Sequence, residues 1–224
     1  MATPIANVDE AELPRFVAVE GPIGVGKTTL ARRLAESFHY PTLLELAAEN
    51  PFLDRFYREG GRHALPTQLF FLLSRARQLA ELGDGNLFHP TLVADFLFQK
   101  DRLFAEVTLD ANELTLYDQI QRSLSIDIPR PDLVIYLQAP TSVLFDRVRR
   151  RGIAAEQHIS NEYLTALIDA YTRFFHFYDE APLLIVNAAE IDFVHNDRHY
   201  EQLVNRIRDM TGMRQYFNPH PTLV

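Results

Sequence analysis

Short apolar segments alternate with amphipathic segments along most of the chain. We expect five strands, at Phe16–Val19, Thr42–Leu46, Leu92–Asp95, Leu133–Gln138 and Leu183–Val186. Short runs that are rich in β-branched residues and separated by helical patterns are typical of parallel strands buried on both faces. The pattern therefore predicts a three-layer α/β fold, in which helices flank a five-stranded parallel sheet.

Helix-capping residues lie between these strands. A polar side chain just before a helical pattern accepts a hydrogen bond from the first free backbone N–H groups. The expected helices start at Asn50 or Pro51, at Pro66 or Thr67, at Ser160 or Asn161 and at Asn196 or Asp197, and the first three end near Tyr57, Leu82 and Tyr178. We expect one domain over residues 14–212, with tails at 1–13 and 213–224.

The composition narrows the class of protein. The chain has 224 residues, of which 47% are hydrophobic, and its net charge is −8. An acidic chain gains no counterion-release affinity from a phosphate backbone, so we expect no nucleic-acid partner. We find no basic, apolar secretion signal and no apolar stretch that could cross a bilayer, and the sequence contains no cysteine. We therefore expect a cytoplasmic protein with no membrane partner.

A glycine-rich segment follows the first expected strand. Residues 21–28 have the sequence GPIGVGKT, which matches G-x-x-x-x-G-K-[ST], and a helical pattern follows at once. Such a loop turns its backbone N–H groups toward phosphate oxygens, while its lysine reaches the β- and γ-phosphates and its hydroxyl binds Mg²⁺. The segment therefore predicts a site for ATP and Mg²⁺ that comprises Gly21, Pro22, Ile23, Gly24, Val25, Gly26, Lys27, Thr28 and Thr29. The N-K-x-D motif that selects guanine in GTPases is absent.

Two carboxylates lie near the ends of expected strands, Glu45 on the second and Asp95 on the third. Ligands of open parallel sheets bind beyond the carboxyl ends of the strands. One carboxylate could therefore deprotonate an acceptor hydroxyl, while the other holds Mg²⁺. The alternative is that both are ordinary solvated loop residues.

Two expected helices carry further candidates. Gln68 and Arg75 share one helical stripe, where they could contact a nucleobase or simply border an amphipathic helix. Arg147 and Arg151 lie one turn apart before Gly152. These two arginines either bind phosphate from a mobile lid, at about residues 147–158, or merely favour the helix dipole.

Taken together, these residues resemble the deoxynucleoside kinase family from about Phe16 to Ile207. The resemblance implies phosphorylation of the 5′-hydroxyl of a deoxyribonucleoside by MgATP, with Glu45 as the base, and a homodimer. It assigns Tyr57 and Glu156 to the sugar 3′-hydroxyl, Gln68, Arg75 and Asp101 to the base, and Lys27, Arg147 and Arg151 to the transferring phosphoryl group. It also implies that Asp95 is the carboxylate that holds Mg²⁺, together with Thr28. The segment Glu49-Asn50-Pro51-Phe52 is similar to that of bacterial purine-preferring members, so we expect deoxyadenosine or deoxyguanosine, with deoxycytidine as a further candidate.

The sequence departs from the family pattern at two positions. Phe96 follows Asp95 where the family usually has an arginine, and Ile153 replaces a second lid arginine. Lys100 or Arg150 is a candidate to supply the missing charge. Two other functions remain open: a nucleoside-monophosphate kinase similar to thymidylate kinase, and a non-catalytic ATP-binding module. The first would need cations for the acceptor phosphate, whereas the second strand ends in the acidic Glu45.

Overall fold

A six-stranded sheet, parallel throughout, forms the centre of the molecule. The computed structural model describes residues 13–86, 91–124, 128–193 and 196–218. The strand order is β2-β3-β1-β4-β5-β6, so that β1 lies inside the sheet between β3 and β4. The strands are β1 (Phe16–Glu20), β2 (Thr42–Leu43), β3 (Leu92–Ala94), β4 (Leu133–Gln138), β5 (Leu183–Asn187) and β6 (Arg214–Phe217).

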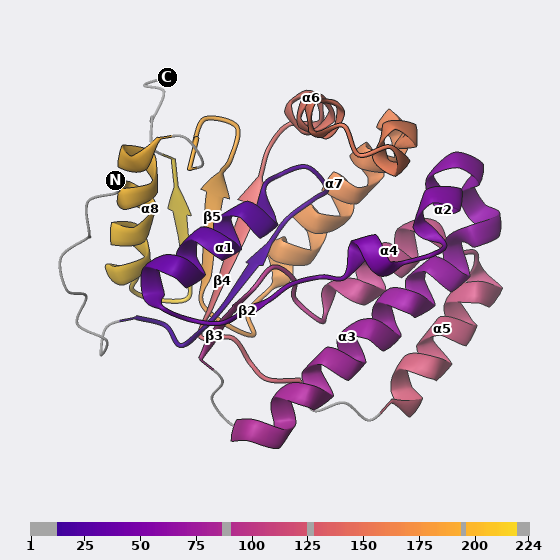
Figure 1. Cartoon of the computed structure of the whole chain (residues 1–224), viewed down its shortest axis with the longest axis horizontal. Helices are drawn as coiled ribbons and strands as arrows, with labels where there is room; N and C mark the ends of the chain where they lie inside the picture. The colour runs from indigo at the N-terminus through magenta and orange to yellow at the C-terminus, as the bar shows by residue number, and fades with distance from the viewer. Residues whose placement is uncertain (1–12, 87–90, 125–127, 194–195, 219–224) are drawn as a thin grey trace.

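Helices cover both faces of the sheet, as expected from the sequence. In Figure 1, α1 and α8 lie on one face, α7 lies on the other, and α3 and α5 lie further out, beyond the β2 side of the sheet. The helices are α1 (Lys27–Phe38), α2 (Leu53–Glu59), α3 (Ala64–Asn86), α4 (Lys100–Thr108), α5 (Ala111–Ser123), α6 (Thr141–Arg151), α7 (Asn161–Phe177) and α8 (Asp197–Arg208). Short 3₁₀ turns form η2 (Ala47–Glu49), η3 (Gly60–His63) and η4 (Ala155–His158). No helix in the described ranges is long and apolar enough to cross a membrane.

Successive strand residues face two separate hydrophobic cores. Val17 and Val19 of β1 belong to the core that α1 and α8 cover, whereas Phe16 and Ala18 belong to the core that α7 covers. This alternation follows from the pleat of a strand, which points neighbouring side chains to opposite faces. Because both faces are buried, every residue of β1 had to be apolar except one, Glu20.

A third, smaller core joins α3, α4 and α5. Leu72 and Leu79 of α3 pack with Ala105 of α4 and Tyr117 of α5. We had not expected α4 and α5 from the sequence. A capping box marks the start of α5, because Asp110 accepts hydrogen bonds from the N–H groups of residues 112 and 113 and Glu113 accepts from Asp110 N. This core fixes α3 against α4, and both helices carry residues of the site described below.

The expectation of five strands was wrong, because β6 adds a sixth within the residues expected to form the C-terminal tail. β6 pairs with β5 at the edge of the sheet, and Phe217 is its one buried residue. An edge strand with exposed polar side chains has no apolar run to reveal it.

The second expected strand is also shorter than predicted, since β2 ends at Leu43. Beyond this point side chains replace the strand ladder: Gln78 donates to Leu44 O at 2.9 Å, and Glu45 N donates to Asp95 Oδ1 at 2.7 Å. Glu45 therefore lies in the loop after β2, held by its backbone to the residue that follows β3.

The predicted capping residues act at two helices and have a different role at a third. Ser160 caps α7 and Asn196 caps α8 through their side-chain oxygens. The helix expected after Asn50 begins only at Leu53, because the Asn50 side chain instead accepts from Phe52 N and donates to Thr67 O. Asn50 thus ties the segment before α2 to the first turns of α3.

Candidate active site

The glycine-rich loop connects β1 to α1, as the motif predicts. Gly21 has φ +147°, and a Cβ atom there would lie 2.3 Å from the carbonyl oxygen of Leu137 on β4. Gly24 has φ +83°, and a Cβ atom would lie 2.8 Å from the Val148 side chain of α6. Side chains at these positions would clash with the neighbouring strand and helix. The loop is therefore pressed against β4 and α6, and it ends at the N-terminus of α1.

The first turn of α1 has no side-chain cap, because its N-cap residue is Gly26. Free N–H groups and the positive end of the helix dipole therefore face the loop, which is the usual arrangement for an anion site. Lys27 Nζ donates to Gly21 O at 2.8 Å and to Pro22 O at 3.3 Å. Burial lowers the pKa of Lys27 to about 8.

Asp95, which follows β3 at the carboxyl edge of the sheet, bridges the loop and the residues after β2. Its carboxylate accepts a hydrogen bond of 2.5 Å from the Thr28 hydroxyl and one of 2.7 Å from Glu45 N. The Asp95 residue is 2% exposed. A carboxylate and a hydroxyl are hard oxygen ligands, which suit Mg²⁺ in a phosphate site. The structure therefore brings together the two residues predicted to bind the metal.

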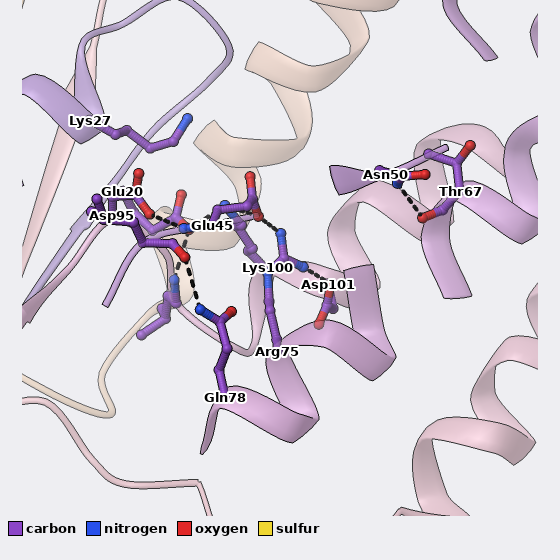
Figure 2. A network of polar contacts seen from close by, with 12 residues as sticks. Glu20, Lys27, Glu45, Asn50, Thr67, Arg75, Gln78, Asp95, Lys100 and Asp101 are labelled. Atoms are coloured by element: carbon purple, nitrogen blue, oxygen red, sulfur yellow. Dashed lines mark hydrogen bonds and ion pairs between the residues drawn. The ribbon is translucent and has the colours of Figure 1, made fainter. Parts of the chain in front are cut away.

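The Glu45 side chain lies between two cations and is 20% exposed. It forms an ion pair with Arg75 of α3, and Lys100 Nζ of α4 lies 3.4 Å from Glu45 Oε1. Arg75 also pairs with Asp101, which is buried beside it (Figure 2). Burial lowers the pKa of Arg75 to about 10, so its guanidinium remains charged at neutral pH.

One cavity joins the phosphate loop to these charges. The wall on the side of the phosphate loop contains Ile23, Gly24, Lys27, Thr28 and Asp95, with Glu45 beside them. Its opposite wall consists of residues from α2, α3, α4, the lid and α7, namely Leu53, Phe56, Tyr57, Thr67, Gln68, Phe71, Arg75, Lys100, Phe104, Arg151, Glu156 and Tyr163. The lining of the cavity therefore combines charged side chains on both walls with the aromatic side chains of α2, α3, α4 and α7.

One ion pair joins the end of α6 to the turn η4, which are the two parts of the expected lid. Arg151 Nε donates to Glu156 Oε2 at 3.0 Å, and α2 packs against the lid turn η4. Tyr57 of α2 lies near Glu156, and burial together with Tyr163 and Glu156 raises the pKa of Tyr57 well above its usual value. Tyr57 and Glu156, which were expected to share one ligand group, thus line the same cavity.

Arg147 does not line the cavity, although it was expected to act with Arg151. Its guanidinium donates to Ala188 O at 2.7 Å and to Val25 O at 3.4 Å. Arg147 therefore holds the back of the phosphate loop to the segment after β5. Arg150 is exposed, whereas Lys100, the other candidate for the missing charge, lines the cavity.

Two residues of this region were missed in the sequence. Glu20 is fully buried, and its carboxylate accepts from Gly21 N and from the Tyr171 hydroxyl of α7, at 2.8 and 2.9 Å. The one signal for Glu20 was a charged residue at the end of an otherwise apolar strand. Asn50 was named as a helix cap and within the segment at residues 49–52, but its side-chain link to Thr67 O was not expected.

Comparisons with known proteins show the family of the chain. The family model described as deoxynucleoside kinase matches residues 17–211. This chain belongs to the deoxynucleoside kinase family. Deoxyguanosine kinase of Bacillus subtilis is 34% identical to this chain over 200 residues, which cover 87% of this chain and 97% of the relative. Deoxyadenosine kinase of Dictyostelium discoideum is 29% identical over 230 residues, which cover 98% and 92% of the two chains.

Solved structures share the fold of the kinase. A deoxyadenosine kinase from M. mycoides, determined with the products dCMP and a flexible dCDP, superposes with a TM-score of 0.75 at 24% identity. The match covers 87% of this chain and 100% of that one. The same enzyme with bound dATP superposes with a TM-score of 0.74. The three-layer architecture expected from the sequence is thereby confirmed.

Proton uptake should accompany the binding of a nucleoside triphosphate near pH 8. With a pKa of about 8, Lys27 is partly neutral in the free protein, and a triphosphate favours its charged form. Calorimetric titrations in two buffers of different ionisation enthalpy should show uptake of up to about half a proton at pH 8, and little at pH 6.

The matched control is Lys27→Arg, which keeps the charge but does not titrate in this range. It should lack the uptake at pH 8, because only the lysine changes its protonation state. Equal uptake by both proteins would contradict the assignment to Lys27.

Proposed function

We propose that the kinase transfers the γ-phosphate of MgATP to the 5′-hydroxyl of a purine deoxyribonucleoside, deoxyguanosine or deoxyadenosine. The observation that carries the proposal is the single cavity that places Glu45 beside Lys27 and Thr28 of the phosphate loop. The family and the purine deoxynucleoside kinases among the relatives support the same reaction.

The phosphate loop is the site for the donor. The free N–H groups at the start of α1 and the Lys27 ammonium neutralise the charge of the β- and γ-phosphates. Thr28 and Asp95 would hold magnesium, which supplies positive charge to the phosphate oxygens when it is bound. Lys27 must leave Gly21 O and Pro22 O to reach the phosphates. When ATP binds, its ammonium therefore exchanges two neutral carbonyl oxygens for charged phosphate oxygens.

Glu45 is the base in this proposal. Its carboxylate accepts the proton of the 5′-hydroxyl while the oxygen forms a bond to the γ-phosphorus and the bond to the leaving ADP oxygen breaks. Arg151 of the lid stabilises the charge on the transferring oxygens. Arg147 contributes indirectly, because it supports the loop through Val25 O. Positioning and charge provide most of the rate in such transfers.

The far wall of the cavity fits the nucleoside. Tyr57 and Glu156 lie where both could hold the sugar 3′-hydroxyl, while the buried side chains of Gln68 and Arg75 offer donors to a base edge. Phe71 lies beside Arg75, with the guanidinium carbon 5.2 Å from the ring centroid, and offers a face on which a base can stack. Asp101 keeps Arg75 in place by pairing with it.

A nucleoside-monophosphate kinase fits this cavity less well. The phosphate of such an acceptor would approach the Glu45 carboxylate, and like charges repel. The two cations beside Glu45 are already engaged, because Arg75 pairs with Asp101 and Lys100 pairs with Glu20. We therefore propose a neutral hydroxyl acceptor.

Replacement of the base should remove turnover and spare donor binding. In Glu45→Gln we expect kcat to fall by about 10²–10⁴-fold, because the amide cannot accept the proton. ATP should still bind with little change in Kd, which calorimetry measures. The control is Glu81→Gln on α3, whose side chain is 71% exposed and lies outside the cavity; it should behave as the wild type. Near-normal kcat in Glu45→Gln would rule out the role of Glu45.

The acceptor class can be tested with a panel of substrates. In an assay of ADP release we expect deoxyguanosine and deoxyadenosine to give higher kcat/KM than thymidine. The corresponding deoxynucleoside monophosphates should give no release above background, because Glu45 repels their phosphate. Faster turnover with a monophosphate than with its nucleoside would refute the proposal.

A further inference from the structure

The placement of lysine in this chain is selective. Lys27 and Lys100 are the only lysines in the sequence, and every other basic side chain of the 22 lysines and arginines is an arginine. Both lysines line the cavity between the phosphate loop and Glu45. Lysine thus occurs only where a compact cation faces the reacting groups, although Lys27 alone belongs to the motif that binds phosphate.

Lys100 gains little from its position in the helix. It is the first residue of α4, where the positive end of the helix dipole disfavours a cation. It is also 1% exposed, and a buried ammonium is costly unless carboxylates pair with it. Burial lowers the pKa of Lys100, and Glu20 acts in the opposite direction. A role in helix stability therefore does not explain this side chain.

Glu20 anchors Lys100. Lys100 Nζ lies 3.1 Å from Glu20 Oε1, which also accepts from Leu97 N at 2.9 Å. The other oxygen accepts from Gly21 N and from the Tyr171 hydroxyl. Three backbone or side-chain donors from different parts of the fold thus fix Glu20. The Lys100 ammonium contacts both Glu20 and Glu45 (Figure 2).

Glu45 consequently lies between two cations that are each held by a buried carboxylate. Arg75 is paired with Asp101, and Lys100 is paired with Glu20. Asp95 fixes the backbone of Glu45 through its N–H group, but it leaves the side chain free to turn. The orientation of the Glu45 carboxylate is therefore set by the two cations, and only the Lys100 cation is anchored to the first residues of the phosphate loop.

We propose that Lys100 is a positioning residue for phosphoryl transfer: held by Glu20, its ammonium aligns the ionised Glu45 carboxylate relative to the phosphate loop. This inference rests on the proposed role of Glu45 as the base. Its consequence is that Glu20 links the loop to the base, because the same carboxylate accepts from Gly21 N and pairs with Lys100. Loss of the ammonium should lower kcat and leave donor binding nearly intact.

The absence of cysteine from the chain allows a test that changes only this charge. In Lys100→Cys, the single thiolate is alkylated in the unfolded protein by 2-bromoethylamine, which restores an ammonium at nearly the length of lysine. The matched control uses 1-bromopropane, which adds a neutral chain with the same number of heavy atoms. Bromide leaves in both reactions, and both adducts are refolded and compared by circular dichroism and thermal unfolding.

We expect kcat of the propyl adduct to be about 10²-fold below that of the aminoethyl adduct, with KM for ATP little changed. The other charged groups around Glu45 are identical in both adducts, including Lys27, Arg75 with its partner Asp101, and Asp95. Equal kcat values of the two adducts would overturn the proposal.

A second variant covers the case in which the propyl adduct fails to refold. Glu20→Gln/Lys100→Met removes both charges of the buried pair, and such neutral replacements are often tolerated by the fold. Its kcat must remain low in a folded protein; a kcat equal to that of the wild type would overturn the proposal. If Glu45→Gln is inactive while the two adducts have equal kcat, only the role of Lys100 is rejected. If Glu45→Gln is active, both proposals are rejected.

Discussion

Buried charges must be paired, and this requirement organises the carboxyl edge of the sheet. Glu20, Asp95, Lys100 and Asp101 are all nearly inaccessible to solvent, and each has a partner of opposite charge or a hydrogen-bond donor. An unpaired ion at such a depth would cost several kcal/mol, so the partners are held in narrow ranges of position. Glu45, in contact with this network but partly exposed, takes its orientation from it.

The topology of the sheet brings these residues together. β3 and β1 are neighbours, so Asp95 and the phosphate loop end at the same edge, while Glu45 follows the adjacent strand β2. The small core between α3 and α4 then brings Arg75 and Lys100 to the same place from outside the sheet. The proposed donor site and the proposed acceptor site are therefore parts of one edge, although their residues are far apart in the sequence.

The residues that could be predicted from the sequence belong to local patterns. The loop at residues 21–28 can be identified by its glycines and its lysine. Glu45 and Asp95 can be identified because each is a carboxylate near the end of an apolar run. Ion pairs between residues far apart in the sequence leave no such pattern. Neither the ion pair of Glu20 with Lys100 nor that of Arg75 with Asp101 could therefore be derived from spacing alone. β6 was missed because an edge strand needs only one buried side chain. Arg147 was named as a candidate for phosphate binding, but its contacts with the carbonyl oxygens of Val25 and Ala188 could not be predicted, because these partners lie far away in the sequence.

The proposed reaction depends on one distance, between the Glu45 carboxylate and the 5′-hydroxyl of a bound nucleoside. A crystal structure with a non-hydrolysable ATP analogue, Mg²⁺ and deoxyguanosine would measure it directly. We expect a Glu45 oxygen within about 2.6–3.2 Å of the 5′-oxygen, on the side facing the γ-phosphate. A nucleoside whose 5′-oxygen points away from that phosphate, or a carboxylate still turned to Arg75 with no contact to the sugar, would contradict it.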